Sequence, residues 1–432
     1  MKTLSLKNKT IIAIVLFAVV FAALIAIASV YDFQVSEILT QNALKDGDYI
    51  ANDVFGVVGE AVGTSPIYIV LAVCTAILCW FFAKVIDKKW WSVTLAVAFA
   101  IVGAVAWWFY IKDIVRYILE HAAAQVGSSA GAIVYEFRHD GAVVAIEWLV
   151  ALTMQAFTVF AFKNLKPETL KKFIWWVIAV LAAVVVANIL IMIIKDPVGR
   201  MRYRAINSNV GKLLIDSNVV QGYTPWYVGN GQPSEDIIKI FVDAYPGASD
   251  AFKSFPSGHT CAAGMSYALI MLPDVIDFKS EKSKKGVKIA CWIIPIANTM
   301  LVAISRIVVG AHYMSDVTFG GTIAFVCMII AREIFVCKGS HFFALFPSAA
   351  PKKVAKVEAG LDVDQSVAEQ ETAEDEFVDE MVEKSVEDVQ TDNAFVAEVS
   401  DEEKEVAVLS EEQANKVSQE IADNLRDGVI SE

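Results

Sequence analysis

The sequence predicts an all-α protein, a polytopic bundle of about eight transmembrane helices with a disordered acidic C-terminal tail. Three observations predict this class. Of the 432 residues, 56% are hydrophobic, and the mean hydropathy is +0.52. The hydrophobic residues are gathered in runs near the length of about 20 residues that spans a bilayer as a helix. After the last run the composition changes sharply, and carboxylates dominate.

The predicted spans follow the apolar runs in order. They cover residues 11–30, 66–83, 91–111, 142–162, 173–194, 260–276, 287–305 and 317–336. The first run follows Lys7 and Lys9 and is longer than the usual signal-peptide core, so we expect an uncleaved anchor, with cleavage after Ala28 as the alternative. All six cysteines lie in or beside these runs without a CxxC pair, so they are interpreted as packing residues.

The distribution of lysine predicts the orientation of the spans. Lysines are concentrated in the connections 84–89, 163–172 and 279–288, and the N-terminus is basic as well. Because positive residues favour the cytoplasmic side, we expect these connections and both chain termini in the cytoplasm. The extracytoplasmic side then holds residues 31–65, 112–141, 195–258 and 306–316. The three polar segments described below all fall on this side.

The chain divides into three predicted regions. An N-terminal transmembrane region of about four spans covers 1–172, a second transmembrane region covers 173–346, and the tail covers 347–432. Residues 351–432 hold 25 acidic and 7 basic residues, whereas the rest holds 24 and 29, so the net charge of −13 comes from the tail. We expect a solvated, largely disordered cytoplasmic tail, and the docking of a protein partner is the alternative.

The first polar segment contains His312 and Asp316, which are four residues apart at the start of the last span. On a helix this spacing places both side chains on one face. A carboxylate bonded to one imidazole nitrogen fixes the tautomer and raises the basicity of the other nitrogen, which suits a nucleophilic histidine. The alternative is a polar helix start with Asp316 as a cap.

The second segment is Pro256-Ser257-Gly258-His259, directly before the sixth span. Proline suits a helix start, and glycine allows close approach to the backbone. Free backbone N–H groups and the positive helix end would therefore face a bound anion. Ser257 adds a hydroxyl donor, and His259 can protonate a departing oxygen. The alternative is a turn into a helix with an incidental histidine.

Three cations complete the pattern. Lys195 ends the fifth span, Arg202 follows seven residues later, and Arg306 ends the seventh span. Fixed positive charges suit a phosphoryl group, whose charge spreads over its equatorial oxygens in the transition state. Arg200 and Arg204 are interpreted instead as ordinary basic side chains that extend to the membrane interface.

In order and spacing, these residues resemble the type 2 phosphatidic acid phosphatase family (PAP2), the membrane lipid phosphate phosphatases. The family pattern is Lys-x6-Arg-Pro, then Pro-Ser-Gly-His, then Ser-Arg-x5-His-x3-Asp. Lys195 and Arg202 fit the first part, residues 256–259 the second, and residues 305–316 the third without gaps. Tyr203 stands where the family has proline, which would stiffen the backbone after the arginine. The resemblance covers about residues 173–336, and two spans are added N-terminally to the six that family members commonly have.

The resemblance implies a PAP2-like catalytic core at 173–346 and a metal-independent, two-step reaction without a cofactor. His312 would attack phosphorus, oriented by Asp316, and His259 would protonate the leaving group. Water would then hydrolyse the phosphohistidine. The expected ligands of the substrate phosphate are Lys195, Arg202, Ser257, the backbone of Gly258, and Arg306. We expect no metal site and no nucleic-acid partner.

The expected protein is an integral cell-membrane phosphatase with its site on the extracytoplasmic face and a phosphorylated lipid as substrate. The candidates are phosphatidic acid, phosphatidylglycerophosphate and undecaprenyl diphosphate. A lipid headgroup phosphotransferase is the alternative enzyme, with an acceptor pocket supplied by the loop 205–254. A non-catalytic lipid-binding scaffold is disfavoured because His259, His312 and Asp316 are all intact. A transporter is disfavoured because, apart from Glu147, few ionisable residues lie in mid-membrane.

Overall fold

The structure is a computed structural model that describes residues 5–44, 47–49, 51, 53–86, 89–126, 137, 139–245 and 248–346. The described part is helical and has no strand, although an isolated bridge pairs Gly47 with Ser208. This confirms the predicted all-α class. The predicted acidic tail from 347 onward lies outside the described residues.

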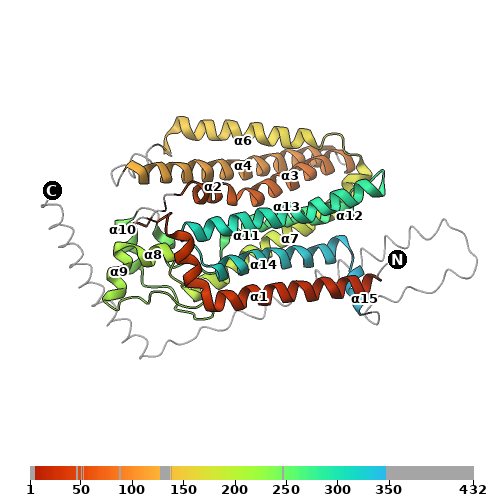
Figure 1. Cartoon of the computed structure of the whole chain (residues 1–432). Coiled ribbons are helices and arrows are strands. Elements are labelled where there is room, and N and C mark those ends of the chain that lie inside the picture. Colours follow the sequence, from red (N-terminus) through yellow and green to blue (C-terminus); the bar gives the residue numbers. More distant parts are fainter. Residues whose placement is uncertain are drawn as a thin grey trace, which may run out of the picture. The chain divides into compact units, whose positions relative to one another are not determined.

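Within the described residues, seven helical segments are long and apolar enough to cross a membrane, and they match seven of the predicted spans (Figure 1). A short turn divides the second of these segments into α2 and α3. The helices that make up the seven segments are α1 (Leu6–Thr40), α2 (Val54–Gly63), α3 (Ser65–Val85), α4 (Lys89–Val126), α6 (Gly141–Ala161), α7 (Pro167–Val198) with the short α8 (Tyr203–Asn207), α13 (Glu281–Val308), and α14 (Met314–Ala331) with the π-helix η3 (Arg332–Val336).

The remaining predicted span, 260–276, is a composite helix rather than a regular one. α11 (Gly258–Gly264), the 3-10 helix η2 (Met265–Met271) and α12 (Leu272–Val275) follow one another directly. A 3-10 helix rises about 2.0 Å per residue and an α-helix about 1.5 Å, so the composite extends over about 30 Å. That length equals the hydrocarbon thickness of a bilayer. The composite runs from the α10 end of the bundle to the opposite end, so the chain crosses the bundle here as well (Figure 1).

α11 is packed among the other helices, inside the bundle rather than on its surface. It contacts α2, α3, α7, α13 and α14, and the main apolar core surrounds it and η2. Small residues permit this close packing: a Cβ on Gly264 would lie only 2.5 Å from the Cβ of Ala324 on α14. The indole of Trp176 on α7 donates to the backbone carbonyl of Ala268 at 3.0 Å, which satisfies a polar group inside the core.

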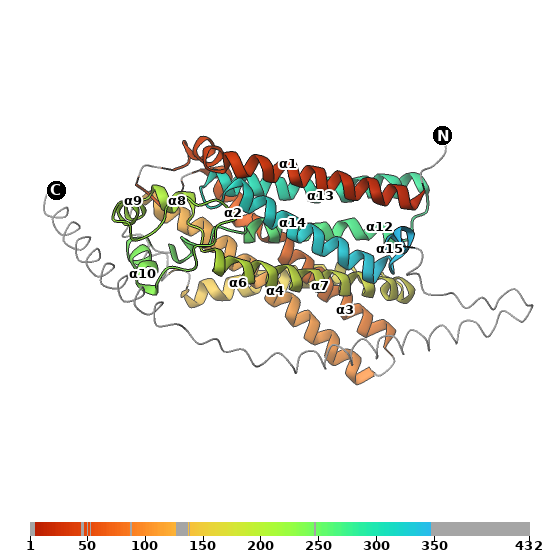
Figure 2. The ribbon, with the colours of Figure 1, turned by 90° about the horizontal axis from the view of Figure 1, so that it is seen from below.

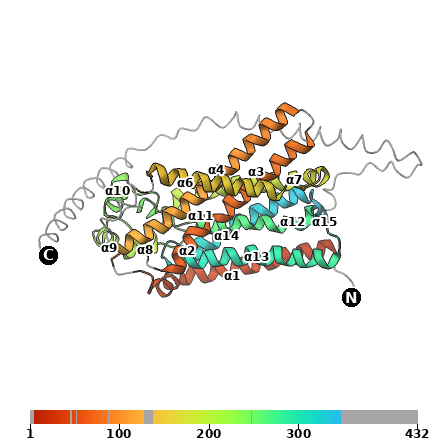
Figure 3. The ribbon, with the colours of Figure 1, turned by 90° about the horizontal axis from the view of Figure 1, so that it is seen from above.

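The two ends of the bundle differ. The loop 205–254 folds into the helices α8 (Tyr203–Asn207), α9 (Asn209–Asp216), α10 (Glu235–Ala244) and η1 (Ala248–Asp250) at one end (Figure 1). α15 (Ser340–Leu345) and the start of α1 lie at the other end (Figure 3). The α3–α4 hairpin is tilted, and its turn projects away from the other helices (Figures 2 and 3). The loop predicted as a long outer segment is therefore a small helical layer over one end of the bundle.

Gly59 of α2 should be required for the packing of α2 on α13. A Cβ at Gly59 would lie 2.1 Å from the Oγ and 2.3 Å from the Cβ of Ser305. We expect Gly59→Ala to lower the free energy of unfolding by about 1–3 kcal/mol, because overpacking outweighs the helix propensity gained. Gly286→Ala on α13, where a Cβ meets nothing within 4 Å, is the matched control and should not destabilise. Thermal unfolding in detergent checks this, and equal midpoints would contradict it.

Candidate active site

The three predicted motifs meet at the end of the bundle that carries α8 to α10 (Figure 1). They occupy the C-terminal end of α7 with the segment after it, the N-terminal end of α11, and the connection from α13 to α14. Backbone hydrogen bonds join them directly. Ser257 N–H donates to the carbonyl of Asp316 at 3.0 Å, and Arg204 N–H, in the segment after α7, donates to the carbonyl of Gly310 at 2.9 Å. Residues that are about 120 positions apart in the chain thus form one site.

His312 lies buried in the turn between α13 and α14, which Gly310 permits with its φ of +62°. Its Nδ1 is 2.6 Å from the backbone carbonyl oxygen of Ser254. A carbonyl can only accept, so Nδ1 carries the proton and the neutral ring has its lone pair on Nε2. Burial lowers the pKa of His312 to about 3, despite the nearby carboxylate of Asp316. The ring is therefore neutral and nucleophilic near pH 7.

Asp316 acts on His312 less directly than the sequence predicted. Its nearest oxygen is 3.8 Å from Nδ1 of His312, beyond hydrogen-bonding distance. The buried carboxylate accepts instead from the hydroxyl of Ser254 at 2.5 Å and from the backbone N–H of Tyr313 at 2.8 Å. Asp316 thus holds Ser254, whose carbonyl orients the imidazole. Ser254 was not among the predicted site residues.

Arg200 is not the interfacial side chain that the sequence indicated. Its guanidinium is fully buried, 2.6 Å from Asp316 Oδ1 and 2.9 Å from Asp32 Oδ2. Its Nε donates to the carbonyl of Thr224 at 2.8 Å, and its Nη1 donates to the hydroxyl of Ser315 at 2.8 Å. A buried cation needs such partners, because removal from water is costly without them. Arg200 therefore connects α1, α14 and the segment before α10 behind the site.

The buried cations Arg202 and Arg306 retain unused donors. Arg202 forms an ion pair with Asp250 at 2.8 Å, and Nη1 of Arg306 lies 3.1 Å from Oε1 of Glu60 without hydrogen-bond alignment. Within the described residues, Nε of Arg202 and all three guanidinium nitrogens of Arg306 make no hydrogen bond. Unpaired donors are costly in a buried place and rare in folded proteins. A tetrahedral oxyanion bound here would satisfy them.

Arg204 also differs from its predicted interfacial position. Its side chain is buried over the ring of Tyr49, 4.6 Å from the ring centroid, with Nη2 3.7 Å from Asp250. Burial alone would raise the pKa of Asp250, but the guanidinium groups of Arg202 and Arg204 outweigh it and hold that pKa below its usual value. Asp250 is thus an ionised partner that positions both arginines.

Ser257 and Lys195 occupy the N-terminal end of α11. The hydroxyl of Ser257 accepts from the backbone N–H of Thr260 at 3.3 Å, so it caps the helix. A Cβ on Gly258 would lie 3.6 Å from the ammonium nitrogen of Lys195, so the absence of a side chain leaves room between the backbone and this cation. The first N–H groups of α11 have no partner within the helix.

His259 has a partner in the N-terminal region. Its Nε2 is 3.0 Å from the phenol oxygen of Tyr117 on α4, and the two rings are edge-to-face. Gly63 of α2 lies beside the same imidazole, because a Cβ there would be 3.9 Å from its Cδ2. Helices that precede the resembling segment therefore reach the predicted proton donor.

Sequence reasoning missed four residues that contact the predicted site, namely Glu60, Tyr117, Asp250 and Ser254, and a fifth, Asp32, that is linked to Asp316 through Arg200. Asp32 interrupts the apolar helix α1, and an ionisable residue within a span is a functional signal. Asp250 and Ser254 lie in irregular chain with no recognisable pattern of their own. Glu147, the mid-membrane carboxylate noted in the sequence, is buried and accepts from the indole of Trp108 at 3.1 Å.

A bundle of apolar helices with this site at one end indicates a membrane phosphatase. Residues 176–338 match the family model of the PAP2 superfamily. The match confirms the family resemblance, and all the predicted site residues lie within it. Asp32, Glu60 and Tyr117 lie outside it. No curated protein and no solved structure matches the chain.

Removal of one partner of Arg200 should destabilise the fold. Asp32→Ala leaves a buried guanidinium with a single carboxylate, so we expect a loss of about 3–5 kcal/mol in the free energy of unfolding. Asp277→Ala removes the partner of Lys172 in an exposed ion pair of 2.8 Å and is the control, with an expected cost below about 1 kcal/mol. Thermal unfolding in detergent measures both, and similar small losses would contradict the role of Arg200.

The depressed pKa of His312 should be visible in a titration. The folded protein keeps this ring neutral from pH 8 down to about pH 5, whereas the unfolded chain takes up the proton at about pH 6.5. Protonation of His312 therefore disfavours the folded state increasingly as the pH falls below about 6.5. NMR of histidine-labelled protein should show one imidazole signal, absent in His312→Asn, that does not shift over this range. A midpoint near 6.5 would contradict the burial of the ring.

Proposed function

We propose that this protein is an integral-membrane phosphatase of lipid phosphates or diphosphates that works through a phosphohistidine at its extracytoplasmic face. One observation carries the proposal. His312 has its proton on Nδ1, held by the carbonyl of Ser254, so the lone pair of Nε2 is free beside buried arginines with unused donors. This combination of a neutral nucleophile and an incomplete anion site suits phosphoryl transfer.

In the first step Nε2 of His312 attacks phosphorus, and the bond from phosphorus to the leaving oxygen breaks. His259 supplies a proton to that oxygen, so the alcohol or phosphate departs without a strongly basic charge. Lys195, Arg202 and Arg306 neutralise the equatorial oxygens of the transferring group. The proton on Nδ1 of His312 stays on that nitrogen and is donated in a hydrogen bond to the carbonyl of Ser254, which stabilises the positive charge of the substituted ring.

In the second step water attacks the phosphohistidine from the side vacated by the leaving group. His259, now deprotonated, accepts a proton from this water, and the bond between phosphorus and Nε2 breaks. Inorganic phosphate leaves, His312 is neutral again, and His259 is ready to protonate the next leaving group. Tyr117, 3.0 Å from Nε2 of His259, positions the ring that serves both steps.

The placement of charge supports a site on the extracytoplasmic side. The lysine-rich connections join α3 to α4, α6 to α7, and α12 to α13, at the end of the bundle away from α8 to α10 (Figure 1). The site lies at the α8–α10 end. Under the positive-inside rule this arrangement favours a cytoplasmic location for the lysines and therefore supports an extracytoplasmic site.

The site also favours a highly charged headgroup. It combines Lys195, Arg202, Arg204 and Arg306 with the carboxylates Asp250 and Glu60. The excess of positive charge matches a terminal phosphate, which carries about −1.5 to −2 at pH 7. Phosphatidic acid, phosphatidylglycerophosphate and undecaprenyl diphosphate all present such a group at the membrane surface.

The proposal predicts phosphate release from lipid by purified protein in detergent, with EDTA present and these three lipids as substrates. The wild type should release phosphate. In His312→Ala the rate of release should fall by at least about 1,000-fold, since the nucleophile is absent. His341→Ala is the matched control and should keep its activity, because His341 pairs with Glu333 at the opposite end of the bundle.

The outcomes separate the competing functions. Appreciable release by folded His312→Ala would refute the nucleophile, and loss of release on adding EDTA would refute metal independence. No release, together with transfer of phosphate to an added alcohol or lipid acceptor, would favour the phosphotransferase. Neither reaction by folded wild-type protein would favour the non-catalytic lipid-binding alternative.

A further inference from the structure

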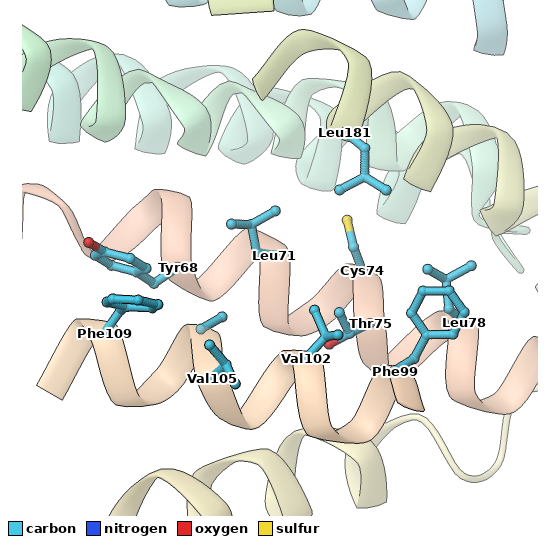
Figure 4. Close-up of a pocket in the computed structure, with 11 residues that line it drawn as sticks. Tyr68, Leu71, Cys74, Thr75, Leu78, Phe99, Val102, Val105, Phe109 and Leu181 are labelled. Atoms are coloured by element: carbon cyan, nitrogen blue, oxygen red, sulfur yellow. The ribbon is translucent and has the colours of Figure 1, made fainter. Parts of the chain in front are cut away.

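An apolar cavity lies between α3, α4 and α7, away from the charged site. Its volume is about 290 Å³, and the surface that faces it is apolar (Figure 4). Most of its wall comes from α3 and α4, which precede the segment matched by the PAP2 superfamily. Leu181 of α7 closes the opposite side (Figure 4). The principal residues of the α3 and α4 wall are Tyr68, Leu71, Leu78, Phe99, Val105 and Phe109.

The cavity is elongated along the helices. Tyr68 faces Phe109 at one end, and Leu78 lies beside Phe99 at the other (Figure 4). Leu78 follows Tyr68 by ten positions on α3, which corresponds to about 15 Å along the helix axis. This is half of the hydrocarbon thickness of about 30 Å, the depth that one lipid chain occupies in its leaflet. The length of the cavity therefore fits a single hydrocarbon chain.

Two hydrogen bonds made by neighbouring turns of α4 lie between the Tyr68 end of the cavity and the proton donor of the proposed reaction. The phenol of Tyr68 donates to Asp113 on α4 at 2.9 Å. One helical turn further along α4, the phenol oxygen of Tyr117 is 3.0 Å from Nε2 of His259. Phe109 and Tyr117 are two turns apart, about 12 Å along the axis. The cavity thus begins within two turns of the group that protonates the leaving oxygen.

We propose that this cavity binds the hydrocarbon chain of the leaving group, so that α3 and α4 select substrates by their chain. The inference rests on the proposed function, because it places the leaving oxygen at His259 and the attached chain along α4. The ligand class is a phosphate or diphosphate ester with at least one long unbranched or prenyl chain. A chain that enters from the bilayer is already in hydrocarbon, so selectivity comes from packing and steric fit rather than from transfer out of water.

A steric block of the cavity tests the proposal in the full-length protein. Val105→Trp fills the cavity, and Val97→Trp makes the same change on the exposed surface of α4. The substrates are dodecyl phosphate, farnesyl phosphate and the chainless ester p-nitrophenyl phosphate. Val105→Trp should lower kcat/KM for the two long-chain esters by at least about tenfold. It should change kcat/KM for the chainless ester by less than about twofold. Val97→Trp should change none of the three by more than about twofold.

The comparison between substrates decides the outcome. Equal losses with all three esters would mean that Val105→Trp disturbs the fold or the site, and no loss would mean that the chain lies elsewhere. Either result overturns the proposal. A loss with farnesyl phosphate alone would restrict the cavity to prenyl chains, and a loss with dodecyl phosphate alone would restrict it to linear chains.

A second measurement separates this proposal from the proposed function. Dodecyl phosphate with a photoreactive diazirine in its chain is irradiated with wild-type protein, and the labelled peptides are identified by mass spectrometry. Labels on the cavity residues of α3 and α4, reduced in Val105→Trp but not in Val97→Trp, support the chain site. Such labels without any phosphate release would keep the chain site and reject the phosphatase. Phosphate release with labels only on residues outside the cavity would keep the phosphatase and reject the chain site.

Discussion

The structure of the site depends on one buried cation. Arg200 lies between Asp32 of α1 and Asp316 of α14, and it also binds the carbonyl of Thr224. A guanidinium is suited to this position because its donors lie in a plane and point in several directions at once. Through Asp316 it holds Ser254, and through Ser254 it orients His312. The proposed nucleophile is therefore positioned by a chain of polar contacts that starts on the first helix.

The other arginines of the site, Arg202, Arg204 and Arg306, are only partly paired with groups of the protein. Arg200 has its partners within the protein, whereas Arg306 has buried donors that the described residues do not satisfy. Arg202 and Arg204 share one carboxylate, Asp250, so the positive charge around them is only partly neutralised. Leaving buried donors unpaired costs stability, and a bound phosphate would offset that cost. This contrast distinguishes a structural cation from cations available to a ligand.

The N-terminal helices are more than an addition to a catalytic core. Asp32, Glu60 and Tyr117 come from α1, α2 and α4, outside the segment that matches the PAP2 superfamily, yet they contact Arg200, Arg306 and His259, respectively. The close approach of Gly59 to Ser305 shows how α2 is packed against the site. The candidate site therefore includes parts of the chain that the family pattern does not include.

The sequence by itself determined the membrane bundle, the order of its spans and the three motifs, because apolar runs and short fixed spacings are local properties. The composite helix 258–275 was predicted only as a span, since its 3-10 centre leaves no mark in an apolar run. Tertiary structure alone decided that Ser254, rather than Asp316, contacts His312, and that Arg200 and Arg204 are buried. Such contacts join residues far apart in the chain, and which of them form depends on how α1, α7 and α14 pack together.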